Sequence, residues 1–191
     1  MKNYLEKLIG PKQAEILCRE VQSTYDLSRL SERQIAEKGV SKQASKKLKA
    51  AIDLGFACVD SARSYGAKIT GPEDVFKLMS PKTKRLESES FFVLILNNKN
   101  LVEKTIEVSK GTGSFCVVSP SDVLAKVLKE EKKAFIVCHN HPSGDPQPSS
   151  DDIELTKRLH EGAKLLELKL LDHVIIGDTE FTSLSKIGLI F

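Results

Sequence analysis

Residues 90–98 form a continuous run, SFFVLILNN, that contains no charged side chain and is rich in Phe, Val, Ile and Leu. A run of this length and composition is typical of a β-strand that is buried on both faces. A second run, AFIVCHNH at 134–141, predicts another strand, and it ends abruptly in two histidines. Helices are expected at 120–130 and 149–167, where apolar residues recur at helical spacing. The chain after residue 66 is therefore predicted to be an α/β domain of the α+β type.

The first part of the chain has a different pattern. Residues 1–66 show the apolar spacing of helices throughout, and Ser31 and Ser41 are expected to cap two of these helices. A linker is expected at about 64–71. Further strands are expected at 101–111, 114–119 and 168–178, with short strands closing the chain. The pattern predicts a small all-helical domain at 1–66 and a second domain at 67–191.

Composition limits the classes of protein to which the chain can belong. No apolar run approaches the roughly 18 residues that a membrane span needs, and the N-terminus mixes charges into its apolar positions, unlike a secretory signal. The four cysteines are far apart, which is typical of reduced thiols. We therefore expect a cytoplasmic protein with no membrane partner. Residues 1–66 hold twelve Lys and Arg against eight Asp and Glu, which permits contact with nucleic acid without requiring it.

The two histidines at the end of the second run lie two positions apart. If that run is a strand, His139 and His141 point to one face and Asn140 to the other, because side chains alternate. Two imidazoles whose Cα atoms are about 7 Å apart on one face can converge on one ion. After a turn rich in Pro and Gly, a helix begins at Ser149, and Asp152 in its first turn can supply a third ligand. Two histidines, one carboxylate and water form a catalytic zinc site with an open position.

Each part of this pattern also has an ordinary structural explanation. Ser149-x-x-Asp152 resembles a capping box, which a helix uses without any metal. Histidines near a strand end can simply be exposed polar residues. Cys138 is expected on the opposite face from the histidines as a small buried residue, and His173 is expected to pack or to hydrogen-bond a ligand. The full spacing, His-x-His, seven residues, Ser-x-x-Asp, is more specific than either half.

That full spacing is similar to the JAMM motif of the JAB/MPN metallopeptidases, and the wider sequence resembles their bacterial RadC branch. The resemblance rests on HNHPSGDPQPSSDD at 139–152, LLDHVIIGD at 170–178 and Gly111-Thr112. It implies an MPN fold with a mixed, largely antiparallel sheet and flanking helices. It also implies one Zn²⁺ per chain, held by three side chains: His139, His141 and Asp152.

The resemblance assigns two further residues to catalysis. In this family a glutamate at the start of an earlier strand carries the proton. The stretch ESESFFVLILNNKN places Glu89 there, with Glu87 as the neighbouring option, and the Glu-x-Phe pattern favours Glu89. Ser149 is assigned to hydrogen-bond the carbonyl oxygen as the tetrahedral intermediate forms. Capping of the helix is an equally good role for Ser149, and one hydroxyl could serve both.

The N-terminal region resembles a helix-hairpin-helix module, whose Gly-x-Gly hairpin presents backbone amides to DNA phosphates. The corresponding stretch is KGVSKQASKKLKAA, with Gly39 at the first glycine and Ser41 at the second, so the module is degenerate. Lys42, Lys46 and Lys47 could still make weak, non-specific contact with DNA. A solvated helix face in a domain that packs on the catalytic one explains the same residues.

Together these features predict a zinc-dependent hydrolase that cleaves a peptide or isopeptide bond in an unidentified substrate. The alternatives are a DNA-associated factor, a metal-dependent nuclease, or a catalytically silent interaction module. Phosphodiester cleavage more often uses two metal ions about 3.5–4 Å apart that share carboxylates. Asp151 projects about 100° from Asp152 around a helix, and Asp145 lies in a turn, so a second ion is not expected. Glu89 favours an enzyme over a silent module.

Overall fold

The computed structural model describes residues 1–110 and 118–190, which form two compact units, Met1–Asp60 and Ser61–Phe191. The division falls a few residues before the predicted domain boundary at 66/67, which stays a prediction. No helix in the described ranges is both long and apolar enough to cross a membrane.

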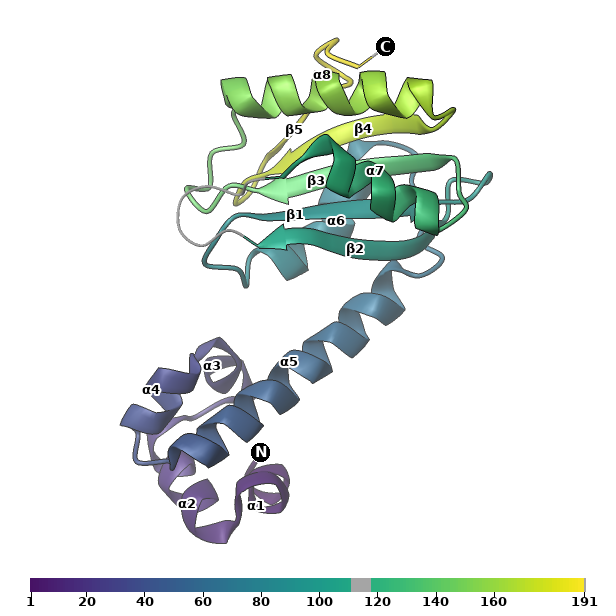
Figure 1. The fold of residues 1–191 in the computed structure, drawn as a ribbon. Helices are drawn as coiled ribbons and strands as arrows, with labels where there is room; N and C mark the ends of the chain where they lie inside the picture. The colour runs from purple at the N-terminus through teal and green to yellow at the C-terminus, as the bar shows by residue number, and fades with distance from the viewer. Residues whose placement is uncertain (111–117, 191) are drawn as a thin grey trace. The chain divides into compact units, whose positions relative to one another are not determined.

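The first unit is helical. Its elements are α1 (Lys2–Ile9), α2 (Pro11–Glu20), α3 (Thr24–Arg29), α4 (Glu32–Glu37) and the first part of α5 (Lys42–Ser64) (Figure 1). The capping box of Ser31 confirms the predicted start of α4, and Ser41 Oγ accepts the amide of Ala44 at 3.3 Å. The short helix α3 was not separated from its neighbours in the sequence, and Ser23 caps it. Leu17 lies fully buried in the small core of this unit.

The second unit is built on one five-stranded sheet. Its strands are β1 (Ser90–Leu96), β2 (Val102–Lys110), β3 (Ala134–Asn140), β4 (Lys169–Ile176) and β5 (Phe181–Ser183). They lie in the order β2-β1-β3-β4-β5, and only the β3–β4 pair is parallel among these neighbours. This arrangement confirms the predicted α+β fold with a mixed, largely antiparallel sheet. β3 is the middle strand, so its end lies at the centre of one edge of the sheet.

Helices cover both faces of this sheet. α6 (Pro72–Thr83) packs on one face, and α7 (Pro120–Lys129) and α8 (Ser150–Leu165) pack on the other (Figure 1). All seven residues of β1 are buried, as expected for its uninterrupted apolar sequence. Alternate residues enter the two cores: Phe91 lies on the α7–α8 side and Phe92 on the α6 side. Side chains of β3 alternate in the same way, so every second one points to the α8 side.

One expected segment makes contacts that the sequence does not predict, and another lies mostly outside the described residues. The expected linker at 64–71 is held to the sheet, since Gly66 N donates to Val102 O at 2.7 Å and Ile69 N to Asn100 O at 2.9 Å. Ile69 is buried in the α6-side core, and that burial explains why the segment is held down. The strand expected at 114–119 lies mostly outside the described residues, and β5 is the short strand that follows β4.

The loop between β3 and α8 lies against the turn between β4 and β5. His141 N donates to Ile176 O at 3.0 Å, and Asp178 N donates to Gly144 O at 3.1 Å. A Cβ at Gly177 would overlap the carbonyl oxygen of Gly144 and press on Pro146. Position 177 therefore needs glycine because two backbone segments meet there.

Gly177→Ala is expected to destabilise the protein by about 1–3 kcal/mol, the usual cost of forcing an added methyl into a packed site. Denaturant unfolding of the purified protein measures this change. Gly55→Ala is the matched control, because a Cβ at helical Gly55 meets nothing within 4 Å. That substitution should stabilise by roughly 0.5–1 kcal/mol. Equal effects of the two substitutions would contradict the close approach at Gly177.

Candidate metal centre

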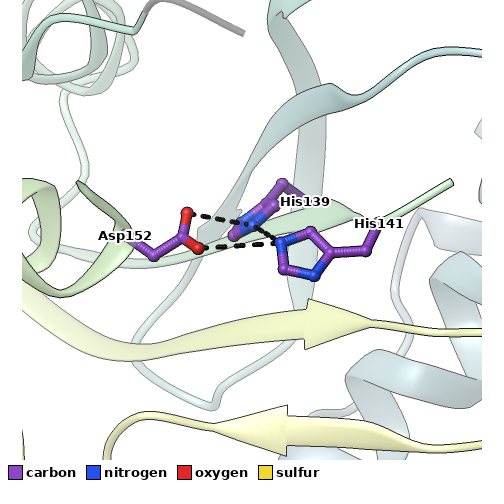
Figure 2. A group of neighbouring side chains, drawn as sticks. All are labelled: His139, His141 and Asp152. Carbon is purple, nitrogen blue, oxygen red and sulfur yellow. Dashed lines mark hydrogen bonds and ion pairs between the residues drawn. The ribbon is translucent and has the colours of Figure 1, made fainter. Parts of the chain in front are cut away.

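Three side chains converge at the end of β3 and the start of α8. His139 lies in β3 and His141 is the first residue after this strand, and Asp152 comes from the first turn of α8 (Figure 2). The two imidazole Nε2 atoms lie 3.0 Å apart. Asp152 Oδ1 lies 3.1 Å from His139 Nε2, and Oδ2 lies 3.6 Å from His141 Nε2. One ligand atom from each residue falls within 4.8 Å of the others, a spacing that one metal ion can bridge.

A chain of hydrogen bonds behind His139 determines where its proton lies. Thr156 Oγ1 donates its proton to the carbonyl oxygen of Asp152 at 2.6 Å. The hydroxyl can then only accept from His173 Nδ1, which lies 2.6 Å away. Burial, followed by the nearby charge of His139, lowers the pKa of His173 well below its usual value, so His173 is neutral and its Nε2 is an acceptor. His139 Nδ1, at 2.8 Å, must donate to that Nε2.

The loop that follows His141 likewise determines which nitrogen of its imidazole carries the proton. Its Nδ1 lies 2.7 Å from the carbonyl oxygen of Asp145, which can only accept, so Nδ1 carries the proton. In the neutral imidazoles of His139 and His141, both Nε2 atoms therefore present lone pairs to each other and to Asp152. Facing lone pairs beside a carboxylate repel unless a proton or a metal cation lies between them. The donor set therefore fits a metal ion, with the outer nitrogen of each histidine bonded as in known metal sites.

Asp152 is held in its ionised form. Burial alone would raise the pKa of its carboxyl group, but hydrogen bonds that His139 and His141 donate when their Nε2 atoms are protonated, with a further one from Ser149, hold that pKa well below the usual range. Ser149 donates to Oδ2 twice, from Oγ at 2.6 Å and from its backbone nitrogen at 2.8 Å. The contact with Asp152 also raises the pKa of His141, so a proton competes with a cation for its Nε2.

Glu89 lies beside this group without belonging to it. It immediately precedes β1, is half-buried, and has a raised pKa, chiefly because burial disfavours the carboxylate and only partly offset by His139. Two residues after Glu89, in β1, the ring of Phe91 stacks on the His139 imidazole, with centroids 5.8 Å apart. Glu87, two residues earlier, is exposed. The charges of the three converging side chains all affect the pKa of Glu89, so its carboxyl group lies near them.

Comparison with known proteins identifies the family. A family described as "RadC-like JAB domain" matches residues 69–189, which is more than half of the chain. The chain belongs to the RadC-like JAB domain family. It is 40% identical over 176 residues to the UPF0758 protein of Staphylococcus epidermidis (strain ATCC 12228), covering 92% of this chain and 78% of that protein. The UPF0758 protein of Staphylococcus aureus (strain NCTC 8325) is 44% identical over 154 residues, covering 81% of this chain and 71% of that protein.

Most of the residues singled out in the sequence lie together in the RadC-like JAB domain. Cys138 faces the α6-side core, opposite His139 as predicted, and burial raises the pKa of its thiol to about 12. His173 bonds to a histidine of the converging group, as expected. The capping box of Ser149 is confirmed. The sequence reasoning missed Thr156, although its position four residues after Asp152 places the two one helical turn apart.

Thr156→Val removes the hydroxyl while keeping the shape of the side chain. His173 then loses its acceptor, and the proton on His139 Nδ1 is no longer enforced, so metal affinity of the JAB domain should fall by about 10–100-fold. Competition with a chromophoric chelator measures this affinity. Thr156→Ser, which keeps the hydroxyl, should stay within a few-fold of the native protein. Equal losses in both variants would show that packing, not the hydrogen bond, matters at this position.

Proposed function

We propose that this protein is a zinc-dependent hydrolase that cleaves the amide bond of a peptide or isopeptide substrate. The observation that carries the proposal is the convergence of two imidazole Nε2 atoms and one carboxylate beside the half-buried Glu89. The JAB domain supports the same reaction class, since the JAMM motif is the motif of JAB/MPN metallopeptidases. A zinc ion held by His139, His141 and Asp152 would act as a Lewis acid and lower the pKa of a bound water towards about 7.

Glu89 is proposed to move the proton. Its carboxylate would take a proton from the attacking water and give it to the leaving amine nitrogen as the C–N bond breaks. Burial brings the pKa of Glu89 closer to neutral pH, which makes the carboxylate a better base and its acid form easier to reach. The exposed Glu87 is the weaker alternative for this role.

Ser149 is proposed to steady the carbonyl oxygen of the substrate as negative charge develops on it. In the structure its hydroxyl proton is donated to Asp152 Oδ2, and its oxygen accepts the Asp152 amide at 3.1 Å. The proposed role therefore needs the hydroxyl to turn away from Asp152. Until it turns, Ser149 orients Asp152.

Two alternatives receive less support. Asp145 and Asp151, the carboxylates nearest to the motif in the sequence, are both exposed, and Asp145 Oδ1 accepts the amide of Gln147. A second metal ion, as many nucleases use, gains no support from these side chains. In the N-terminal unit the amide of Ser41 is already bonded to Gln13 Oε1 at 2.8 Å. Any DNA contact there would rest on three exposed lysines and be weak, non-specific and salt-dependent: Lys42, Lys46 and Lys47.

The purified protein is expected to bind about one zinc ion per chain, because the three converging side chains complete one four-coordinate site with water. Metal analysis after chelation and reloading measures this number. The double substitution His139→Ala, His141→Ala should abolish binding and leave the circular dichroism spectrum unchanged. Retained zinc in that variant would place the metal elsewhere, and unfolding of the variant would indicate a structural rather than a catalytic ion.

Glu89→Gln should keep the zinc but lower hydrolysis by about 10²–10⁴-fold, the usual contribution of general acid–base catalysis. The assay presents zinc-loaded protein with a panel of fluorogenic peptides and isopeptide conjugates, and separately with single- and double-stranded DNA. Glu87→Gln is the matched control and should keep native turnover. Zinc loss in Glu89→Gln would make that residue a ligand. DNA cleavage that disappears in Asp152→Ala, without any peptide turnover, would contradict the peptidase proposal.

A further inference from the structure

Asn140, the residue between the two histidines, makes its contacts on the other side of β3. It is only 4% exposed. Its Oδ1 accepts the amide of Ser90 at 3.0 Å, and its Nδ2 donates to the carbonyl oxygen of Ser88 at 3.3 Å. The orientation of the side-chain amide is determined, because a backbone N–H can only donate and a carbonyl can only accept. One side chain therefore bonds to the backbone on both sides of Glu89.

The course of β3 explains why a side chain has to make these contacts. The register of β1 with β3 begins with Phe91 opposite His139. The pairing of β3 with β4 runs one residue further, to Asn140 opposite Ile176, and the amide of His141, the first residue after β3, bonds to Ile176 O. The side-chain amide of Asn140 carries one donor and one acceptor, as a peptide group does. It therefore continues the pairing with β1 by one more step.

We propose that Asn140 is a positioning residue that holds Glu89 at a fixed place beside the metal ligands. The inference rests on the proposed role of Glu89 as proton carrier. Residues 84–88, which lead into Glu89, form turns and bends rather than a helix or strand. The two bonds from Asn140 fix both peptide groups that flank Glu89, so they limit where its carboxyl group can lie.

The chemistry of the contact also restricts the residue type. Aspartate keeps an acceptor for Ser90 but turns a second acceptor towards the carbonyl of Ser88, where the two oxygens repel. Serine is too short to bond both groups, and leucine has the shape but neither bond. Of these side chains, only asparagine meets one donor and one acceptor at the observed distances. The alternative is that Asn140 merely stabilises the end of the sheet, and the experiment has to separate the two roles.

Asn140→Asp is the test variant, and Asn97→Asp is its matched control. Asn97 follows the other end of β1, where its Oδ1 accepts two backbone amides, from Lys99 at 2.9 Å and Leu101 at 3.1 Å. Both substitutions change an asparagine that bonds to backbone next to the same strand, but only one lies beside Glu89. If Asn140→Asp does not fold, Asn140→Leu replaces it, since its apolar side chain suits the neighbouring α6-side core.

The first readout does not need a substrate. A crystal structure of the zinc-loaded Asn140→Asp protein should show the Glu89 carboxyl group displaced or disordered, with the three ligands in place and zinc still near one per chain. The Asn97→Asp structure should show Glu89 unmoved. An unmoved Glu89 in the Asn140 variant would overturn the proposal whether or not the protein proves to be a hydrolase.

The second readout is a double-mutant cycle on peptide hydrolysis. Asn140→Asp alone should lower kcat by about 10–100-fold with little change in KM, because a misplaced catalytic group costs rate rather than binding. In the Glu89→Gln background the same substitution should cost almost nothing more, because Asn140 acts through Glu89. Losses that multiply would assign Asn140 a purely structural role. Full turnover in Glu89→Gln would instead defeat the proposed function and leave the crystallographic result to decide the contact.

Discussion

The position of β3 at the centre of the sheet is the constraint on which the rest of the structure depends. β3 bonds to β1 on one side and to β4 on the other, and a helix covers each face. Each element that contributes to the candidate metal centre is a neighbour of this strand. β1 follows Glu89, β4 carries His173, and α8 carries Asp152 and Thr156. Most of these side chains therefore lie on hydrogen-bonded strands or a packed helix, which hold side chains more closely than loops do. His141 and Glu89 lie one residue outside β3 and β1.

Because the hydrogen-bonded chain behind the candidate metal centre is buried, each of its polar atoms needs a partner. His139, His173 and Thr156 are all 0% exposed, and a buried polar group without a partner costs about 1–3 kcal/mol. Every hydrogen-bonding atom of this chain has a partner until His139 Nε2, which faces His141 and Asp152. Within this buried chain, His139 Nε2 is the atom that still demands a partner. A proton or a metal cation can meet this demand, so the interior of the domain and the candidate metal centre are parts of one arrangement.

The sequence could predict the parts of this arrangement that depend on local periodicity. Alternation along 134–141 placed His139 and His141 on one face, and capping chemistry placed Asp152 in the first turn of a helix. The partners of Asn140 could not be found this way, because Ser88 and Ser90 lie about fifty residues earlier. Periodicity says which face a side chain occupies but not which distant backbone it meets. The hydrogen bonds of the expected linker at 64–71 could not be found for the same reason, since their partners, Asn100 and Val102, lie in the turn before β2 and at its start.

The side chains of the His-Asn-His sequence point alternately to the two faces of the sheet, and those on each face make different contacts. The histidines present Nε2 atoms on the α8 side, and Asn140 bonds to the backbone around Glu89 on the side away from them. His139 and Asn140 lie in β3, and His141 directly follows it, so a shift of β3 would move the two histidines and the contacts around Glu89 together. Asp152 lies on α8, where Ser149 holds it. The glutamate therefore needs no contact with the ligands themselves to keep its place beside them.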